Sequence, residues 1–203
     1  PQNPKTPRIV IKFKFEMAFS ANTPQVHFIG EVRGAKGFEA ERLFCKFEFR
    51  AGHNWTLMGG KDQGETFEEV RDSVEEHSVW DHPFDLHYKS KAIRGWPKLY
   101  VEVWQANSQG RYAVAGYGIG VLPFEPGQHA IEIKCWVPKP QGWWKQLKSN
   151  WFGVKPELVF KDMLFSGAER FGFEAETTGT VEVDVGVILK DFQLHGVSLY
   201  TNK

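Results

Sequence analysis

The sequence predicts an all-β protein built as an antiparallel β-sandwich, and three observations support this. Apolar and polar residues alternate with a period of two in one segment after another. Glycine and proline interrupt these segments at short intervals, as the turns between strands require. Only one segment, over about residues 142–152, has the apolar spacing of a helix. Many short strands with a single helix are typical of a sandwich.

The strands are expected where the alternation is strictest, at 26–32, 43–49, 98–104, 129–136 and 181–189. Weaker alternation predicts further strands near 54–58, 65–70, 84–88, 112–121, 158–165 and 169–174. In the longest run Val183, Val185 and Val187 share one face, so we expect them in the core. Cys45 and Cys135 also fall on apolar faces, and without a Cys-x-x-Cys pair they are expected as reduced core thiols.

The helix predicted over 142–152 carries an apolar stripe with two possible uses. Trp143, Leu147 and Trp151 lie at i, i+4 and i+8, which favours a helix that caps an open end of the sandwich. Nearby lysines also suit a docking or membrane-surface element, because Trp and Lys are common where apolar and wet regions meet. Trp144 lies off the stripe, and we expect it to be exposed.

The chain is expected to form one domain over 17–203, behind a short extension over 1–16. The extension alternates over 9–15, so it is either a natural appendage that adds a strand to a sheet edge or a remnant of cloning in front of Met17. No repeat, low-complexity tract or linker divides the rest of the chain.

Composition excludes several classes of protein. Lys+Arg and Asp+Glu each number 25, which argues against a protein built to cover nucleic acid or an acidic membrane. A hydrophobic fraction of 41% is too high for a disordered chain. No run approaches the ~20 apolar residues that span a bilayer. With no apolar leader and few cysteines, the cytoplasm is the expected compartment.

The sequence holds no convincing catalytic or metal-binding pattern. Asp85 and His87 lie two apart on a predicted strand and would face the same way, but a zinc site needs three or four converging ligands. Structural hydrogen bonding is therefore favoured over a metal. Nucleophile elbows, zinc-protease motifs and phosphate-binding loops are all missing from the sequence. Gly116-Tyr117-Gly118-Ile119-Gly120 suits a packed strand better than an anion loop. The prediction is no enzyme and no cofactor.

The segment from Leu99 to Gly120 resembles the strand–loop–strand core of C2 domains. In those domains a Leu-x-Val-x-Val-Trp strand leads into an acidic calcium loop. Here the acidic positions are taken by Gln105 and Asn107, which lack the charge that offsets the dehydration of calcium. The resemblance thus implies a C2-like antiparallel β-sandwich with one short inserted helix and no calcium site.

A longer set of motifs resembles the B9-domain family, from about Val26 to Gly196. The matching segments are Val26–Val32, Gly34-Ala35-x-Gly37-Phe38, Leu43–Lys46, Trp80-x-His82-Pro83-x-Asp85-Leu86-His87, Gly95-Trp96-Pro97, Ala115–Gly118 and Ser166–Arg170. The resemblance implies a non-enzymatic component of the ciliary transition zone and basal body, within the Meckel syndrome complex. It implies assembly with sibling B9-domain proteins, a role in cilium assembly, and restriction of membrane-protein traffic.

Without a catalytic site, activity must lie in the surface, where aromatic side chains often anchor interfaces. The candidates are Trp144 and two tryptophans on the polar-facing register of their strands, Trp104 and Trp136. In 98–104, Tyr100, Glu102 and Trp104 alternate with Leu99, Val101 and Val103. A calcium-independent peripheral lipid-binding module is the main alternative. A carbohydrate-binding sandwich is a further one, although such modules are usually extracellular.

Overall fold

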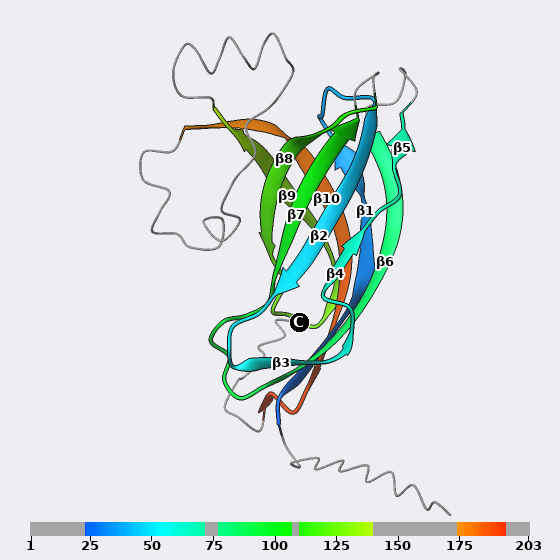
Figure 1. The fold of residues 1–203 in the computed structure, drawn as a ribbon. Helices are drawn as coiled ribbons and strands as arrows, with labels where there is room; N and C mark the ends of the chain where they lie inside the picture. The colour runs from blue at the N-terminus through cyan, green and yellow to red at the C-terminus, as the bar shows by residue number, and fades with distance from the viewer. Residues whose placement is uncertain (1–22, 72–76, 107–109, 140–173, 194–203) are drawn as a thin grey trace, which may run out of the picture.

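The computed structural model describes residues 23–71, 77–106, 110–139 and 174–193, which form antiparallel strands (Figure 1). In chain order the strands are β1 (Gln25–Lys36), β2 (Arg42–Arg50), β3 (Trp55–Gly60), β4 (Gln63–Glu65), β5 (Glu69–Val70), β6 (His77–Ser90), β7 (Lys98–Ala106), β8 (Tyr112–Val121), β9 (Gly127–Pro138) and β10 (Ala175–Lys190). The all-β prediction is confirmed for these ranges. The predicted helix over 142–152, the strands at 158–165 and 169–174, and the extension over 1–16 lie outside them.

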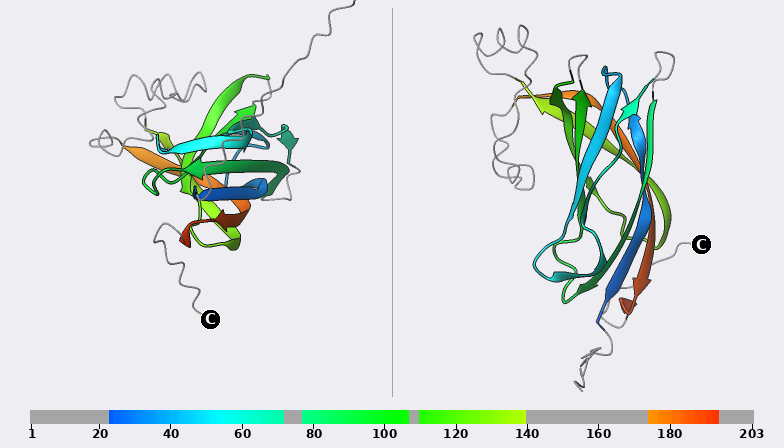
Figure 2. Two further views of the ribbon diagram at one scale, coloured as in Figure 1. Left: turned by 90° about the horizontal axis from the view of Figure 1, so that it is seen from below. Right: turned by 45° about the vertical axis from the view of Figure 1, so that its right-hand side comes forward.

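The strands form a single curled sheet in the order β3-β6-β1-β10-β9-β8-β7-β2-β4, with β5 also paired to β2. Its two halves join where β8 meets β9, through only two residue pairs, Tyr117↔Trp136 and Gly118↔Cys135. Figure 2 shows the curl from below and from one side. The curl brings β2 over β6, because the Phe49 and Phe84 rings lie 4.8 Å apart and the Trp80 indole N–H donates to the Leu43 carbonyl at 3.4 Å.

The core lies inside this curl and contains the side chains that period-two alternation predicted. Val183, Val185 and Val187 of β10 are buried, as are Cys45 and Cys135. Both cysteines are free thiols, and burial raises the pKa of Cys45 well above its ordinary value and that of Cys135 to about 12. They therefore stay protonated and act as small apolar residues.

The glycine-rich run of β8 is a packed strand, as the sequence predicted. A Cβ atom on Gly118 would lie 2.7 Å from Cγ2 of Ile133 and 2.9 Å from Cγ2 of Val101. Glycine therefore makes room for the Ile133 side chain, which fills the gap where β8 and β9 diverge.

The strand predicted over 65–70 is wrong, since two short strands, β4 and β5, take its place. Thr66 interrupts the ladder between them. Its hydroxyl accepts the Cys45 N–H at 2.9 Å, and its own N–H donates to the Cys45 carbonyl at the same distance. A side chain thus satisfies a backbone group that a strand partner would otherwise pair.

Strands β9 and β10 pair from Gly127↔Val187 to Pro138↔Ala175, with one register shift. Beyond the last pair, the Lys139 N–H donates to the Glu174 carbonyl at 2.9 Å. The described chain before and after residues 140–173 therefore meets at one point.

Candidate functional site

An aromatic cluster, separate from the main core, covers the outside of β7, β8 and β9. We call it the aromatic face, and its residues are Tyr100, Trp104, Val114, Tyr117, Ile119 and Trp136. Two of the tryptophans proposed from the sequence, Trp104 and Trp136, lie here, and both are half-buried. Trp144 lies outside the described residues.

Strand alternation and register build this face. Leu99, Val101 and Val103 of β7 point into the core, so the residues between them point outward. One row then crosses four strands, with Lys46 opposite Glu102, Glu102 opposite Tyr117, and Tyr117 opposite Trp136. Residues far apart in the chain thereby form one continuous surface.

Glu102 lies at the centre of this row and is only 2% exposed. The Tyr100 hydroxyl donates to Oε1 at 2.8 Å, and the Trp104 indole N–H donates to Oε2 at 3.3 Å. Burial, followed by the negative charge of Glu102, raises the pKa of Tyr100 far above its ordinary value, so the phenol stays a donor. The sequence analysis did not single out Glu102. The available signal was a glutamate flanked two residues away on each side by a tyrosine and a tryptophan.

Beside Glu102 the surface is hollowed by about 370 Å³ between β2, β4 and β7. We call this the acidic hollow, and its lining residues are Lys46, Phe47, Glu48, Gln63, Gly64, Glu65, Tyr100 and Glu102. The Lys46 ammonium lies 3.6 Å from a carboxylate oxygen of Glu65 and 5.1 Å from the centre of the Trp104 ring. The hollow and the aromatic face are therefore contiguous.

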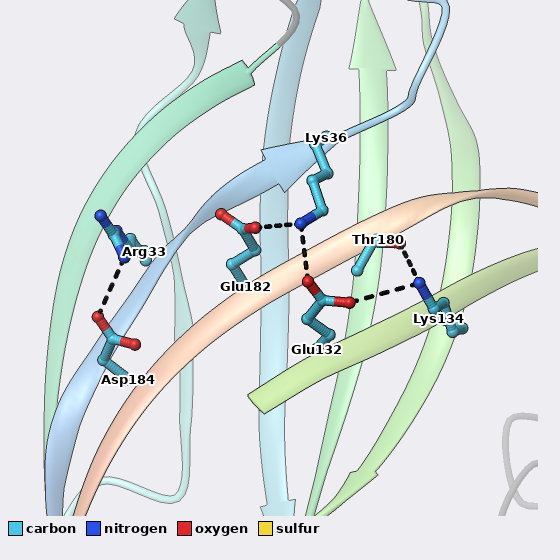
Figure 3. A network of polar contacts seen from close by, with 7 residues as sticks. All are labelled: Arg33, Lys36, Glu132, Lys134, Thr180, Glu182 and Asp184. Atoms are coloured by element: carbon cyan, nitrogen blue, oxygen red, sulfur yellow. Dashed lines mark hydrogen bonds and ion pairs between the residues drawn. The ribbon is translucent and has the colours of Figure 1, made fainter. Parts of the chain in front are cut away.

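The outer surface of β1, β10 and β9 is different, because ion pairs cover it (Figure 3). The Lys36 ammonium donates to Glu132 at 2.8 Å and to Glu182 at 2.5 Å, and Lys134 lies 3.4 Å from Glu132. The carboxylates raise the pKa of Lys36, and the two lysines lower that of Glu132. Such exposed pairs contribute little to stability and mark a solvated surface. The aromatic face is the better candidate for an interface.

The Asp85 and His87 side chains make hydrogen bonds on the outside of β6 and β1. The His27 Nε2 atom bonds to Asp85 Oδ1, and the His87 Nε2–H donates to Gln25 Oε1 at 2.9 Å. The two imidazole rings lie 5.3 Å apart. Within the described ranges no three His, Cys, Asp or Glu side chains come together as a metal site.

His87 gives a testable pH dependence. Burial, and next the neighbouring His27, lower the pKa of His87 below its ordinary 6.5. The unfolded chain then binds this proton more readily, so stability is complete above about pH 6.5 and falls as the pH drops below it. In urea unfolding at about pH 7.5 and pH 5.5, we expect His87→Gln to lose less stability than the wild type. His53→Gln, an exposed control, should behave as the wild type, and an unchanged pH dependence in His87→Gln would contradict the assignment.

Gln105 does not occupy a loop, as the C2 resemblance implied. It lies within β7, where it pairs with Leu43 on one side and Ala113 on the other. Asn107 lies outside the described residues. We also find no helix in the described ranges with the length and hydropathy to cross a membrane.

Known proteins match this chain over nearly all of its described strands. A family model described as "Ciliary basal body-associated, B9 protein" (B9-C2) matches residues 26–188. B9 domain-containing protein 2 of Homo sapiens is 37% identical over 174 residues, which cover 85% of this chain and 98% of that protein. The Danio rerio protein of the same name is 38% identical over the same coverage. B9 domain-containing protein 1 of Xenopus laevis is 28% identical over 180 residues, or 87% of this chain and 91% of that protein.

A search of solved structures matched a C2 domain of plant Extended Synaptotagmin 1, with a TM-score of 0.40 and 12% identity. The match covers 84% of this chain and 97% of that one. The family match spans β1 to β10 and includes the aromatic face and the acidic hollow. The chain belongs to the B9-C2 family of ciliary basal body-associated B9 proteins.

Proposed function

We propose that this chain is a non-enzymatic adaptor of the ciliary transition zone, within the Meckel syndrome complex. It binds other B9-domain proteins in a hetero-complex, and through that complex it supports cilium assembly and the gating of ciliary membrane proteins. Family membership supports the ciliary location. The partner role rests on one structural observation, namely that a half-buried aromatic cluster lies on the outer surface of a sheet rather than in its core.

An aromatic surface of this kind fits an adaptor. Trp and Tyr are over-represented among the residues that dominate binding energy, because they combine a large apolar area with a polar group. The principal contacts of β7 with other described strands are with β2 and β8, its neighbours in the sheet. The aromatic face is thus available on the side away from the main core, where a second domain can cover it.

Binding to B9 domain-containing protein 1 tests this proposal directly. The purified full chain is mixed with that protein, and the mass of the complex is measured by size-exclusion chromatography with light scattering. We expect a stable hetero-complex that Trp104→Ala together with Trp136→Ala weakens. The charged surface supplies a matched control, Glu132→Gln, which should leave the complex intact. If the two proteins elute separately at micromolar concentrations, the proposal is wrong.

A second candidate, a calcium-independent peripheral lipid-binding module, is favoured by a different observation. Phe67, Val70 and Tyr112 are 59%, 65% and 55% exposed, and they lie where β5 and β8 meet their loops. Exposed apolar side chains can enter the boundary between lipid headgroups and acyl chains. Co-sedimentation with vesicles of phosphatidylserine and phosphatidylcholine in EDTA decides between the two candidates. Sedimentation that Phe67→Ser abolishes would favour the lipid-binding module.

A further inference from the structure

The acidic hollow has a surplus of negative charge. Three carboxylates line it, from Glu48, Glu65 and Glu102, against the single ammonium of Lys46. Lys46 lies beside Glu65, and Arg50 from outside the hollow donates to Glu48 at 2.7 and 3.2 Å. The two rim glutamates thus each have a basic neighbour, whereas the donors at 2.8 and 3.3 Å from Glu102 are a phenol and an indole. These two neutral groups orient the Glu102 carboxylate without cancelling its charge.

Glu102 is also held in place by its surroundings. It is flanked on its own strand by both donors, and its neighbours across the ladder are Lys46 and Tyr117. A carboxylate at 2% exposure in a fixed orientation binds a charged partner with little loss of side-chain entropy. Such a partner bond is stronger than it would be in open solvent, because water screens it less.

The walls of the hollow suit a basic side chain. The Tyr100 and Phe47 rings line it, so an aliphatic stem can pack against them while its charged end reaches Glu102. On the β4 side Gly64 keeps the wall free of side chains, because a Cβ atom there would lie 2.4 Å from the Phe47 ring. Lys46 already shows that this surface attracts a cation, since its ammonium lies over the Trp104 and Phe44 rings.

We propose that the acidic hollow receives a lysine or arginine side chain of a partner protein, and that an apolar residue of the same partner covers Trp104 and Trp136. This inference rests on the proposed adaptor function and specifies the chemistry of the partner. Trp136 lies two strands from Glu102, so the basic and apolar groups of the partner are separated by about 10 Å. Charge complementarity selects the partner, and the aromatic face supplies the apolar contact area.

A pair of small probes tests the hollow without a partner protein. N-acetyl-arginine amide and N-acetyl-citrulline amide, which have similar shapes but differ in charge, are titrated into the ¹⁵N-labelled full chain. We expect the arginine probe alone to shift the indole N–H resonance of Trp104, which is assigned from Trp104→Phe. Equal shifts from both probes, or a shift from neither, would overturn the proposal.

Variants around the hollow should change probe affinity in opposite directions. Glu102→Gln keeps the size of the side chain and removes its charge, so the arginine probe should bind about tenfold more weakly. Lys46→Met removes the resident cation, so the probe should bind about twofold or more tightly. Glu132→Gln, on the ion-paired surface, should leave affinity unchanged. Opposite effects cannot arise from general loss of folding, and changes in the same direction would count against the hollow.

The same variants separate this inference from the proposed function. If the wild-type chain and the Glu102→Gln variant bind B9 domain-containing protein 1 equally well, the adaptor function stands and the hollow is not its contact. If the wild type forms no complex but the charge-selective probe binding and its variant pattern hold, the adaptor function fails for that partner and the hollow is retained as a basic side-chain site. Loss of both the complex and probe binding in Glu102→Gln supports both.

Discussion

Trp96→Ala should destabilise the protein by about 3–5 kcal/mol, the usual cost of removing a buried tryptophan. The Trp96 side chain is 8% exposed and joins parts of the chain that are distant in sequence. Its ring lies 5.9 Å from that of Phe28, 5.1 Å from Trp55 and 6.2 Å from Phe192. Its indole N–H donates to the Leu122 carbonyl at 3.0 Å. Alanine would leave a cavity and an unpaired carbonyl together.

This loss is large beside the total stability of about 5–15 kcal/mol of an ordinary domain. Guanidinium unfolding, followed by circular dichroism, measures it as a shift of the midpoint. Phe67→Ala is the matched control, because Phe67 is also aromatic but 59% exposed, and it should change stability by no more than about 0.5 kcal/mol. Similar losses in the two variants would show that Trp96 does not join these elements.

Gly30→Ala should cost about 3 kcal/mol, through a collision with backbone. A Cβ atom at Gly30 would lie 2.0 Å from the Asp184 carbonyl oxygen and 2.9 Å from the Val185 Cα. Neither atom can turn away as a side chain can. Strand β1 is paired on both sides, to β6 and to β10, so relief requires a shift in a ladder that crosses the middle of the sheet.

Gly186→Ala provides the control on the same pair of strands. Gly186 lies opposite Ile29, one position from Gly30, and its added Cβ would meet only the end of the Gln128 side chain, at 2.7 Å. That side chain can move, so we expect a change within about 1 kcal/mol, including the small gain of alanine over glycine in a strand. Urea unfolding of both variants measures the difference. Equal losses would mean that backbone approach does not set the cost at Gly30.

Alternation in the sequence predicted which residues face the core, but not which strands are neighbours. Val183, Val185 and Val187 are buried as expected, because period two is a local property of an extended chain. The contact between β8 and β9 depends on Tyr117 and Gly118 meeting residues of a strand that follows later in the chain. No local pattern encodes that pairing. The length of β6 was also underestimated, since Asp81 adopts a φ of 44° within it and Pro83 lacks an N–H.

The candidate site was predictable only in part, for the same reason. The polar register of their strands placed Trp104 and Trp136 on the outer surface, where the structure has them. That they belong to one cluster follows from the order β9-β8-β7, which alternation does not contain. Glu102 had the pattern of an ordinary solvated residue. Its burial depends on Tyr100, Tyr117 and Lys46 from three strands, and therefore on the completed sheet.

The hydrogen bond between Lys139 and Glu174 has a practical consequence for work in cells. Because the chain leaves β9 and enters β10 at one point, the sheet places no length requirement on what connects them. Lengthening a connection of this kind adds only a logarithmic entropic cost, about 0.6 kcal/mol for each doubling. A fluorescent protein with adjacent termini, spliced in between residues 140 and 173, would leave every described strand uncut and both ends of the chain unaltered. The position therefore suits an internal reporter for imaging this protein at the base of the cilium.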